Sequence, residues 1–292
     1  MDLASFYIHQ INKHYPELEI NSVYFNREGQ NNDVLLVNDA FIFRFSKVPE
    51  AAKSLRREIM LLQNLQGQVS LNIPDPIFKN IETSNVRESF VGYRIIPGRP
   101  LWREELEGIQ DENALESVAR QLSKFLHELH RLPINRALFL ELPHGDTQEE
   151  WADIYDRIRA KLFSYMRPEA QNQVEGHFEA YLDESDRYIF KPALRHGDFG
   201  AGNILYDPDQ ISVVGIIDFS SARIGDPAVD FAGLYASYGE AFYRRCYLYY
   251  PEMEDALERA RFYFGTFALQ EALFGIENGD QNAFRNGIAN FR

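Results

Sequence analysis

The sequence has little cysteine, no long apolar run and a shortage of positive charge. Its single cysteine among 292 residues, Cys246, excludes an intrachain disulfide and any zinc cluster built from cysteines. No run approaches the roughly 18 apolar residues of a membrane span. Residues 1–19 carry charges where a signal peptide would have an apolar core. We therefore expect a cytoplasmic protein.

The charge balance is acidic, with 30 Lys and Arg against 44 Asp and Glu and a formal net charge of −14. Phosphate-rich surfaces would be repelled by such a chain, so neither a nucleic acid nor an anionic membrane is expected as a partner. A cationic ligand would suit this charge, and so would a plain requirement for solubility. The remaining composition, 45% hydrophobic and 14% aromatic, supports a large core in one domain or two lobes.

The most informative segment is 194–218, which begins LRHGDFGAGNILY and ends VGIIDF. Asp198 and Asn203 lie five positions apart, and two short apolar runs around a Pro-containing turn then lead to Asp218. Two such runs predict a hairpin, which would bring Asn203 and Asp218 to one end of a small sheet. In phosphoryl transfer, one carboxylate accepts the proton of the attacking hydroxyl while oxygen ligands hold magnesium against the nucleotide phosphates. The spacing therefore predicts a kinase-type site.

The chain after Asp218 limits the acceptor. It reaches Gly225 within seven residues, which leaves no room for the long activation segment on which a protein kinase holds its substrate. The acceptor is accordingly expected to be a small molecule.

The segments HGDFGAGN, IIDF and GDPAVD (225–230) together resemble the aminoglycoside phosphotransferase family. The resemblance implies an α+β, two-lobed, protein-kinase-like fold. An N-terminal antiparallel-sheet lobe for nucleotide binding would span 1–96. A larger, mainly helical lobe would span 97–292, with a helical subdomain at about 148–190. The resemblance also implies roles for five residues. Asp198 would be the catalytic base, and Asn203 and Asp218 would bind Mg²⁺. His196 and the buried Asp230 would be structural supports.

The first lobe offers candidates for the phosphate site. Residues 40–46 alternate, with three phenylalanines on one side and Arg44 on the other. Arg44 stands where protein kinases have a lysine, and it would clamp phosphate oxygens; the alternative is a strand arginine that reaches solvent. Glu58 follows 14 positions later on a predicted helix, 51–65, where the ion-pair partner belongs. The turn at 27–33 has one glycine, so an ordinary hairpin turn and a phosphate loop both remain open.

A hinge between the lobes is predicted at 90–101, where a strand runs into a Pro- and Gly-rich connector. The sequence SFVGYRIIPGRPL resembles the hinge of the 2″-aminoglycoside phosphotransferases. The resemblance places Tyr93 at the back of the base pocket and implies nucleotide contacts from Arg94, Ile95 and Ile96. A bulky tyrosine at this position would narrow the space for adenine, which in some relatives accompanies the use of GTP. The donor is therefore expected to be either ATP or GTP.

Two histidine patterns in the second lobe are interpreted as structural. His127 and His130 lie three positions apart on a predicted helix, 117–132, but no third metal ligand is near. A second His-Gly-Asp tripeptide ends at Asp146, and no asparagine follows it five positions later. We therefore interpret that tripeptide as a coincidence.

The sequence constrains the identity of the acceptor less than any other part of the predicted function. Family members usually line the acceptor pocket with carboxylates that match ammonium groups. Here the candidates are Tyr235, Glu240 and Glu271, and the tail 262–279 also resembles that of the macrolide phosphotransferases. The leading hypothesis is an antibiotic-resistance kinase that phosphorylates an aminoglycoside hydroxyl, as a monomer or weak dimer. Alternatives are a macrolide or other hydroxylated-metabolite kinase of the same fold, and a catalytically inactive nucleotide-binding regulator.

Overall fold

The computed structural model describes residues 2–27, 31–133, 142–183 and 189–292. The chain forms two compact units. The first includes Met1–Leu101 and Gly202–Ala222, and the second includes Trp102–Ile134, Pro143–Ala201 and Arg223–Arg292. Three residues of the predicted turn at 27–33, residues 28–30, lie outside the described part of the chain.

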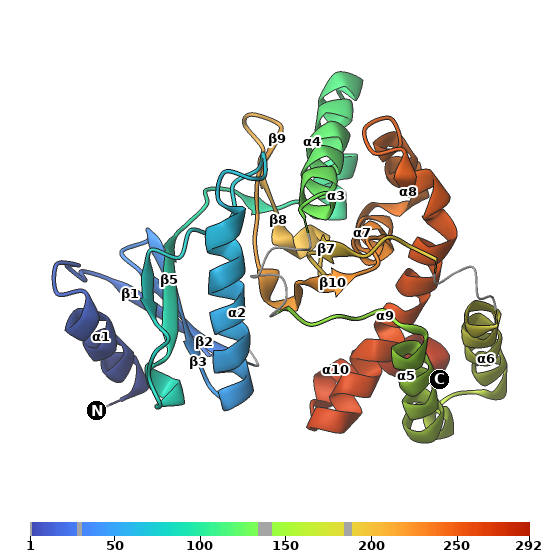
Figure 1. Cartoon of the computed structure of the whole chain (residues 1–292), viewed down its shortest axis with the longest axis horizontal. Helices are drawn as coiled ribbons and strands as arrows, with labels where there is room; N and C mark the ends of the chain where they lie inside the picture. Colours follow the sequence, from blue (N-terminus) through green and yellow to red (C-terminus); the bar gives the residue numbers. More distant parts are fainter. Residues whose placement is uncertain (1, 28–30, 134–141, 184–188) are drawn as a thin grey trace. The chain divides into compact units, whose positions relative to one another are not determined.

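The first unit is built on an antiparallel five-stranded sheet in the order β1-β2-β3-β5-β4 (Figure 1). A second, three-stranded sheet in this unit has the order β6-β8-β9. The strands and helices are α1 (Leu3–His14), β1 (Val23–Asn26), β2 (Asn32–Val37), β3 (Phe41–Ser46), α2 (Pro49–Leu65), β4 (Phe78–Asn80), the 3₁₀ helix η1 (Val86–Glu88), β5 (Phe90–Arg94), β6 (Arg99–Pro100), β8 (Ile204–Asp207), β9 (Ser212–Ile216) and the 3₁₀ helix η6 (Phe219–Ser221).

Strand alternation places different side chains on the two faces of the five-stranded sheet. Phe43 and Phe45 of β3 are fully buried, and they pack with Tyr7 and Ile11 of α1. On the opposite face, Val91 of β5 packs against the apolar side of α2. Each helix therefore covers one face, and the alternation predicted for 40–46 is confirmed.

The segment Gly202–Ala222, which the sequence analysis assigns to the second lobe, packs with the first compact unit. The reason is hydrogen bonding over long sequence distances. β6 pairs with β8, and the Asn72 side chain donates to the carbonyl of Val214 at 2.6 Å. The backbone carbonyl of Asn72 accepts the N–H of Ile216 at 2.9 Å.

The second unit is mainly helical, with one two-stranded antiparallel sheet of β7 and β10. Its elements are α3 (Arg103–Glu107), α4 (Glu112–His130), α5 (Gln148–Leu162), the 3₁₀ helix η3 (Phe163–Tyr165), α6 (Pro168–Leu182), β7 (Ala193–Arg195), β10 (Arg223–Gly225), α7 (Ala228–Cys246), α8 (Glu252–Asp255), α9 (Leu257–Asn278), α10 (Gln281–Ile288) and the 3₁₀ helix η7 (Ala289–Phe291); η5 (Ala201–Asn203) joins this unit to the first.

Aromatic side chains fill much of the core of the second unit. Phe125 of α4 stacks on Phe199, and Tyr155 of α5 stacks on Phe178 of α6. Helix α7 is broken at Gly239, whose φ of 76° lies in the left-handed region that favours glycine. Helix α7 therefore consists of two helical pieces, and it ends at Cys246.

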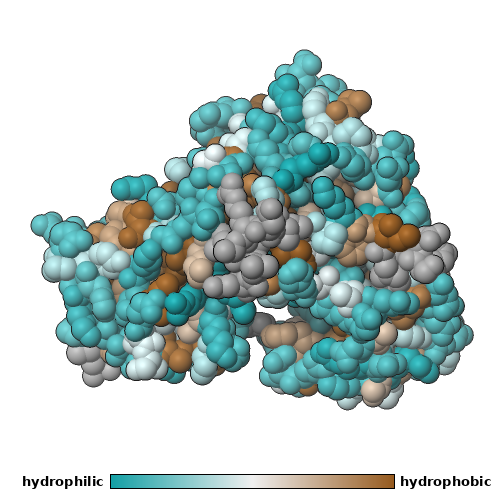
Figure 2. All heavy atoms as spheres, viewed as in Figure 1, coloured by the Kyte–Doolittle hydropathy of each residue, from teal (hydrophilic) through white to brown (hydrophobic). Residues whose placement is uncertain are grey.

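On the face shown in Figure 2, hydrophilic residues cover most of the area and hydrophobic residues occupy small separate patches. Within the described residues, no helix is long and apolar enough to cross a membrane.

Candidate active site

The β8–β9 hairpin brings two of the predicted functional residues to the same end. Asn203 immediately precedes β8, and Asp218 follows β9 by two residues. The backbone N–H of Ile217 donates to the carbonyl of Asn203 at 3.0 Å, which closes this end of the hairpin. The predicted hairpin is confirmed, and both side chains line one cavity of about 450 Å³.

Asp218 has an unusual backbone conformation, with φ of 60° and ψ of 75°. Only a few per cent of non-glycine residues have positive φ, and aspartate tolerates it better than most because its short side chain bonds locally. Its carboxylate accepts the N–H of Ser220 at 3.3 Å and caps the following 3₁₀ helix η6. The side chain is still 44% exposed, so its oxygens are accessible to a ligand.

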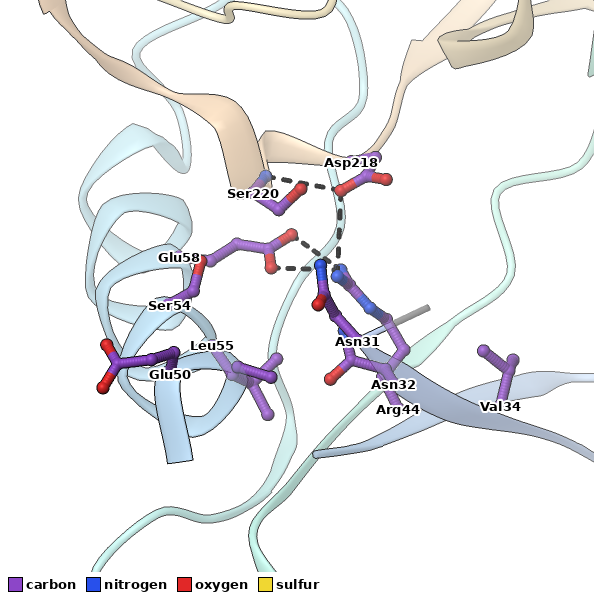
Figure 3. A pocket seen from close by; sticks show the side chains of 11 residues that line it. Asn31, Asn32, Val34, Arg44, Glu50, Ser54, Leu55, Glu58, Asp218 and Ser220 are labelled. Carbon is purple, nitrogen blue, oxygen red and sulfur yellow. Dashed lines mark hydrogen bonds and ion pairs between the residues drawn. The ribbon is translucent and has the colours of Figure 1, made fainter. Parts of the chain in front are cut away.

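Arg44 of β3 lies between two carboxylates (Figure 3). Its Nη1 donates to both oxygens of Glu58 on α2, at 2.8 and 3.0 Å, and its Nη2 lies 3.7 Å from Oδ1 of Asp218. Burial opposes the charged form of Arg44, but the attraction of Glu58, Tyr93 and Asp218 outweighs it and raises the pKa of Arg44. The structure thus pairs Arg44 with Glu58, as predicted from their spacing, and holds a permanent positive charge beside Asp218.

Two neighbouring cavities share Val34, Arg44 and Asp218. The first, of about 460 Å³, is drawn in Figure 3 and has a polar lining that includes Asn31, Asn32, Ser54 and Ser220. The second, of about 450 Å³, is lined mainly by aliphatic side chains, which include Leu36, Ile42 and Leu205. Both sizes fall in the range of small-molecule sites. A polar cavity joined to an apolar one suits the phosphates and the base of a nucleotide.

The predicted hinge residues border the apolar cavity. Tyr93, Arg94, Ile95 and Ile96 all line it, and burial raises the pKa of Tyr93. The Arg94 guanidinium lies over the Phe41 ring, 4.9 Å from its centroid. The N–H of Ile95 donates to the carbonyl of Ala40 at 2.9 Å, so this group is already used within the fold.

In the second unit, the buried Asp230 of α7 holds the backbone of the His-Gly-Asp loop. Its two carboxylate oxygens accept the N–H groups of His196, at 2.8 Å, and Gly197, at 2.7 Å. Burial alone would raise the pKa of Asp230, but a hydrogen bond from His130 at 3.0 Å, together with the other donors, lowers it. The carboxylate therefore stays ionised where it braces the loop.

Asp198 lies at the exposed tip of that loop. Its backbone N–H donates to Nδ1 of His196 at 3.3 Å, and its carbonyl accepts the N–H of Gly200 at 2.9 Å. Gly197, with φ of 85°, makes the sharp turn before it. Ala201, at the far side of the loop, donates its N–H to Oγ of Ser237 on α7 at 2.9 Å. The loop is thus fixed on both sides of Asp198 while the carboxylate remains accessible.

A family model described as the phosphotransferase enzyme family matches residues 23–263. The chain belongs to this family. It is 28% identical over 269 residues to viomycin phosphotransferase from Streptomyces vinaceus, with 91% of each chain covered.

Solved structures of other phosphotransferases share the fold. The GDP complex of aminoglycoside 2′-phosphotransferase-IIIa is 27% identical with a TM-score of 0.89, and the match covers 98% of this chain and 96% of that one. Macrolide 2′-phosphotransferase type I is 21% identical with a TM-score of 0.77, over 99% and 96% of the two chains. The expected kinase-like fold is confirmed, as is the expectation of a phosphotransferase.

Two of the phosphotransferase's three candidate acceptor residues already make hydrogen bonds within the fold. Glu240 accepts hydrogen bonds from Arg244 at 2.6 and 2.9 Å and from Arg261 at 2.7 Å. These bonds, with that of Arg261 the strongest influence, lower the pKa of Glu240 to about 2. Tyr235 donates its hydroxyl to Glu240 at 3.3 Å. Glu271 is exposed on α9.

His130, interpreted from the sequence as structural rather than as a metal ligand, supports Asp230. It is buried, and its ring nitrogens contact Asp230 at 3.0 Å and the hydroxyl of Tyr250 at 3.2 Å. In the sequence, the apolar stripe of the same helix is the signal that indicates burial near His130. Among the described residues, no group of three or more His, Cys, Asp or Glu side chains is arranged to hold a metal ion by itself.

Proposed function

We propose that this phosphotransferase transfers the γ-phosphoryl group of ATP or GTP to a hydroxyl of an aminoglycoside. The observation that carries the proposal is the Arg44–Glu58 ion pair beside Asp218, where a polar and an apolar cavity adjoin. Catalysis of phosphoryl transfer depends mainly on positioning and charge stabilisation, and a fixed arginine next to a carboxylate supplies both. We further propose a cytoplasmic monomer or weak dimer.

Asp198 is proposed as the base that orients and deprotonates the acceptor hydroxyl. It is exposed, while the backbone on either side of it is fixed by Asp230 and Ser237. A base held in this way loses little freedom when the acceptor binds, which lowers the entropic cost of reaching the transition state.

Asn203 and Asp218 are proposed to hold Mg²⁺. The donor set fits: both offer oxygen ligands, and both lie at one end of the hairpin. Magnesium in nucleotide sites is bound by one or two protein side chains together with phosphates and water. When bound, the ion would neutralise phosphate charge; Arg44 adds a second positive charge from the protein itself.

The donor is proposed to be a purine nucleoside triphosphate that places its base in the apolar cavity. A structure 27% identical to this chain was solved as a GDP complex, which supports GTP as one candidate. Tyr93 lines this cavity, and its ring would limit the space that is left for the base.

An aminoglycoside is the leading acceptor because a similar structure, at 27% identity and a TM-score of 0.88, was solved as the GDP and kanamycin complex of APH(2″)-IIia. One observation favours a second candidate. Glu240 is already neutralised by Arg244 and Arg261, which leaves fewer free carboxylates for ammonium groups. A less cationic acceptor, such as a macrolide or another hydroxylated metabolite, would suit that arrangement. Resistance to the antibiotic would follow from either antibiotic acceptor.

The test is a transfer assay with ATP and with GTP against kanamycin and other aminoglycosides, viomycin, macrolides and cell extract. Mass spectrometry would locate the transferred phosphate. We expect a phosphorylated aminoglycoside, and no product from Asp198→Ala although it still binds nucleotide. Phosphorylated macrolide without aminoglycoside product would overturn the leading acceptor. Nucleotide binding without turnover on any acceptor would favour the inactive regulator.

A further inference from the structure

The second His-Gly-Asp tripeptide is part of a buried network. The Asp146 side chain is 3% exposed and accepts two hydrogen bonds from Arg195, from Nε at 2.8 Å and from Nη2 at 3.0 Å. Its Oδ2 also accepts the backbone N–H of Asp226 at 3.0 Å. A bidentate carboxylate–guanidinium pair has a fixed geometry, so Asp146 holds both partners in defined positions.

Both partners of Asp146 lie next to the residues that brace the His-Gly-Asp loop, which carries Asp198. Arg195 is the last residue of β7 and directly precedes His196. Asp226 follows β10 and lies four residues before Asp230. The brace itself consists of the N–H groups of His196 and Gly197 bound to the Asp230 carboxylate. Asp146 therefore connects β7, which leads to the N–H donors of His196 and Gly197, with the segment after β10, which leads to the acceptor Asp230.

The backbone at Asp146 and at Gly225 has features that these hydrogen bonds require. Asp146 has φ of 65°, a left-handed conformation that aspartate tolerates at some cost. A Cβ at position 225 would collide with the Asp146 carboxylate, so glycine is required where β10 passes it. Glu150 of α5 accepts the N–H of Asp146 at 2.6 Å and bonds Arg223 of β10 at 2.9 Å.

We propose that Asp146 is a positioning residue for phosphoryl transfer, which sets the register between β7 and the start of α7 and thereby places Asp198. The proposal rests on the proposed function for the role of Asp198. A buried ion pair is by itself weak evidence for any role, because its desolvation cost can cancel its attraction. What distinguishes this pair is that it joins the two segments on which the loop depends.

The test variant is Asp146→Asn, which keeps the size of the side chain but removes its charge. We expect kcat to fall by about tenfold to a hundredfold, because small displacements of a catalytic group have effects of that size. The KM for the nucleotide should stay within about twofold, since both nucleotide cavities are lined by residues of the first unit.

A second readout needs no turnover. Hydrogen exchange of the peptide 194–201 should accelerate at the amides of His196 and Gly197, which the Asp230 brace protects in the wild type. The matched control is Asp153→Asn, which removes an exposed ion pair with Arg157 on α5. The control should change neither kcat nor exchange.

The outcomes separate this inference from the proposed function. A wild-type protein that phosphorylates no acceptor would refute the function, and the exchange experiment would still decide the role of Asp146. A folded Asp146→Asn protein with wild-type kcat and wild-type exchange at 196–197 would overturn the inference. If that variant does not fold, Arg195→Lys keeps the charge but loses the bidentate contact. Unchanged exchange at 196–197 in Arg195→Lys would then overturn the inference, and faster exchange would support it.

Discussion

Both carboxylate oxygens of Glu58 accept hydrogen bonds from one nitrogen of Arg44, although the two residues lie on different elements, α2 and β3. Glu58 is 4% exposed and Arg44 12%. Without Glu58, the buried Arg44 would keep the longer contact of 3.7 Å to Asp218 but lose its two hydrogen bonds, and it would be free to leave the position in which it faces the polar cavity.

We therefore expect Glu58→Gln to raise the KM for the nucleotide by about tenfold, which corresponds to about 1.4 kcal/mol of binding. The same variant should lower the free energy of unfolding by about 1–3 kcal/mol, because a buried donor loses its charged acceptor. Initial rates and urea unfolding measure the two effects. Glu82→Gln is the control, since it removes an exposed ion pair with Arg56 in the same unit. An unaltered nucleotide KM in Glu58→Gln would contradict the role given to the pair.

Asp218→Asn tests the proposed magnesium site. The amide oxygen can still cap Ser220, so the backbone should keep its conformation, but the site loses a negatively charged ligand. We expect the Mg²⁺ concentration for half-maximal rate to rise by about tenfold or more. Asp207→Asn at the opposite end of the same hairpin serves as the control, because the Asp207 side chain accepts hydrogen bonds from Asp209 and Gln210 of its own turn. Equal magnesium requirements in wild type and Asp218→Asn would exclude Asp218 as a ligand.

The sequence predicts those parts of the site that depend on regular spacing. Arg44 follows from the alternation of β3, and Glu58 from its position on the next helix. Asn203 and Asp218 lie at the same end of the hairpin because two short strands joined by a turn run antiparallel. In each case a local pattern fixes which way the side chain points or where the strand ends.

Two of the supporting residues, His130 and Asp146, could not be predicted because nothing local distinguishes them. A histidine on an amphipathic helix has the same spacing whether it faces solvent or, like His130, bonds a buried carboxylate. Asp146 looks like any loop aspartate until β7 and β10 pair beside it. The bond from Asn72 to Val214 joins residues 142 positions apart, and it helps to place Gly202–Ala222 in the first unit.

His130→Ala tests how much the buried network contributes. Asp230 would lose one of its donors and Tyr250 a partner, so we expect the free energy of unfolding to fall by about 1–3 kcal/mol and kcat to decrease. His127→Ala is a matched control on the same helix, because its ring contacts Tyr250 but no bond joins it to Asp230 in the described structure. Thermal unfolding and initial rates measure both variants. Equal losses in the two variants would assign the effect to Tyr250 rather than to Asp230.

Gly233→Ala tests the close approach of α7 to the His-Gly-Asp loop. A Cβ at this position would collide with the backbone carbonyl of Phe199, the residue after Asp198. Overpacking of this kind costs about 1–3 kcal/mol, and here the strain would displace the loop, so kcat should fall as well. Gly176→Ala in α6 meets open space and should instead stabilise the protein by about 0.5–1 kcal/mol. A fully active Gly233→Ala enzyme would show that the loop tolerates displacement.

Glu277 of α9 makes the stability of the second unit depend on pH. It accepts hydrogen bonds from Arg157 of α5, at 2.6 and 3.0 Å, and from Lys161 at 2.6 Å. These bonds, that of Arg157 first, lower its pKa from 4.5 to about 2. A carboxyl group with a lowered pKa in the folded state stabilises that state fully above the unfolded value of 4.5. This stabilisation is lost as the pH falls from 4.5 towards 2.

The comparison of wild type with Glu277→Gln in urea unfolding at pH 7, 5 and 3.5 checks this dependence. The wild type should be more stable by a nearly constant amount at pH 7 and 5, and the difference should shrink at pH 3.5. Raised salt should also reduce the difference, because ion pairs that water can reach are screened. A difference that stays the same at all three pH values would mean that Glu277 titrates alike in the folded and unfolded chain, and that the two basic partners do not hold its charge.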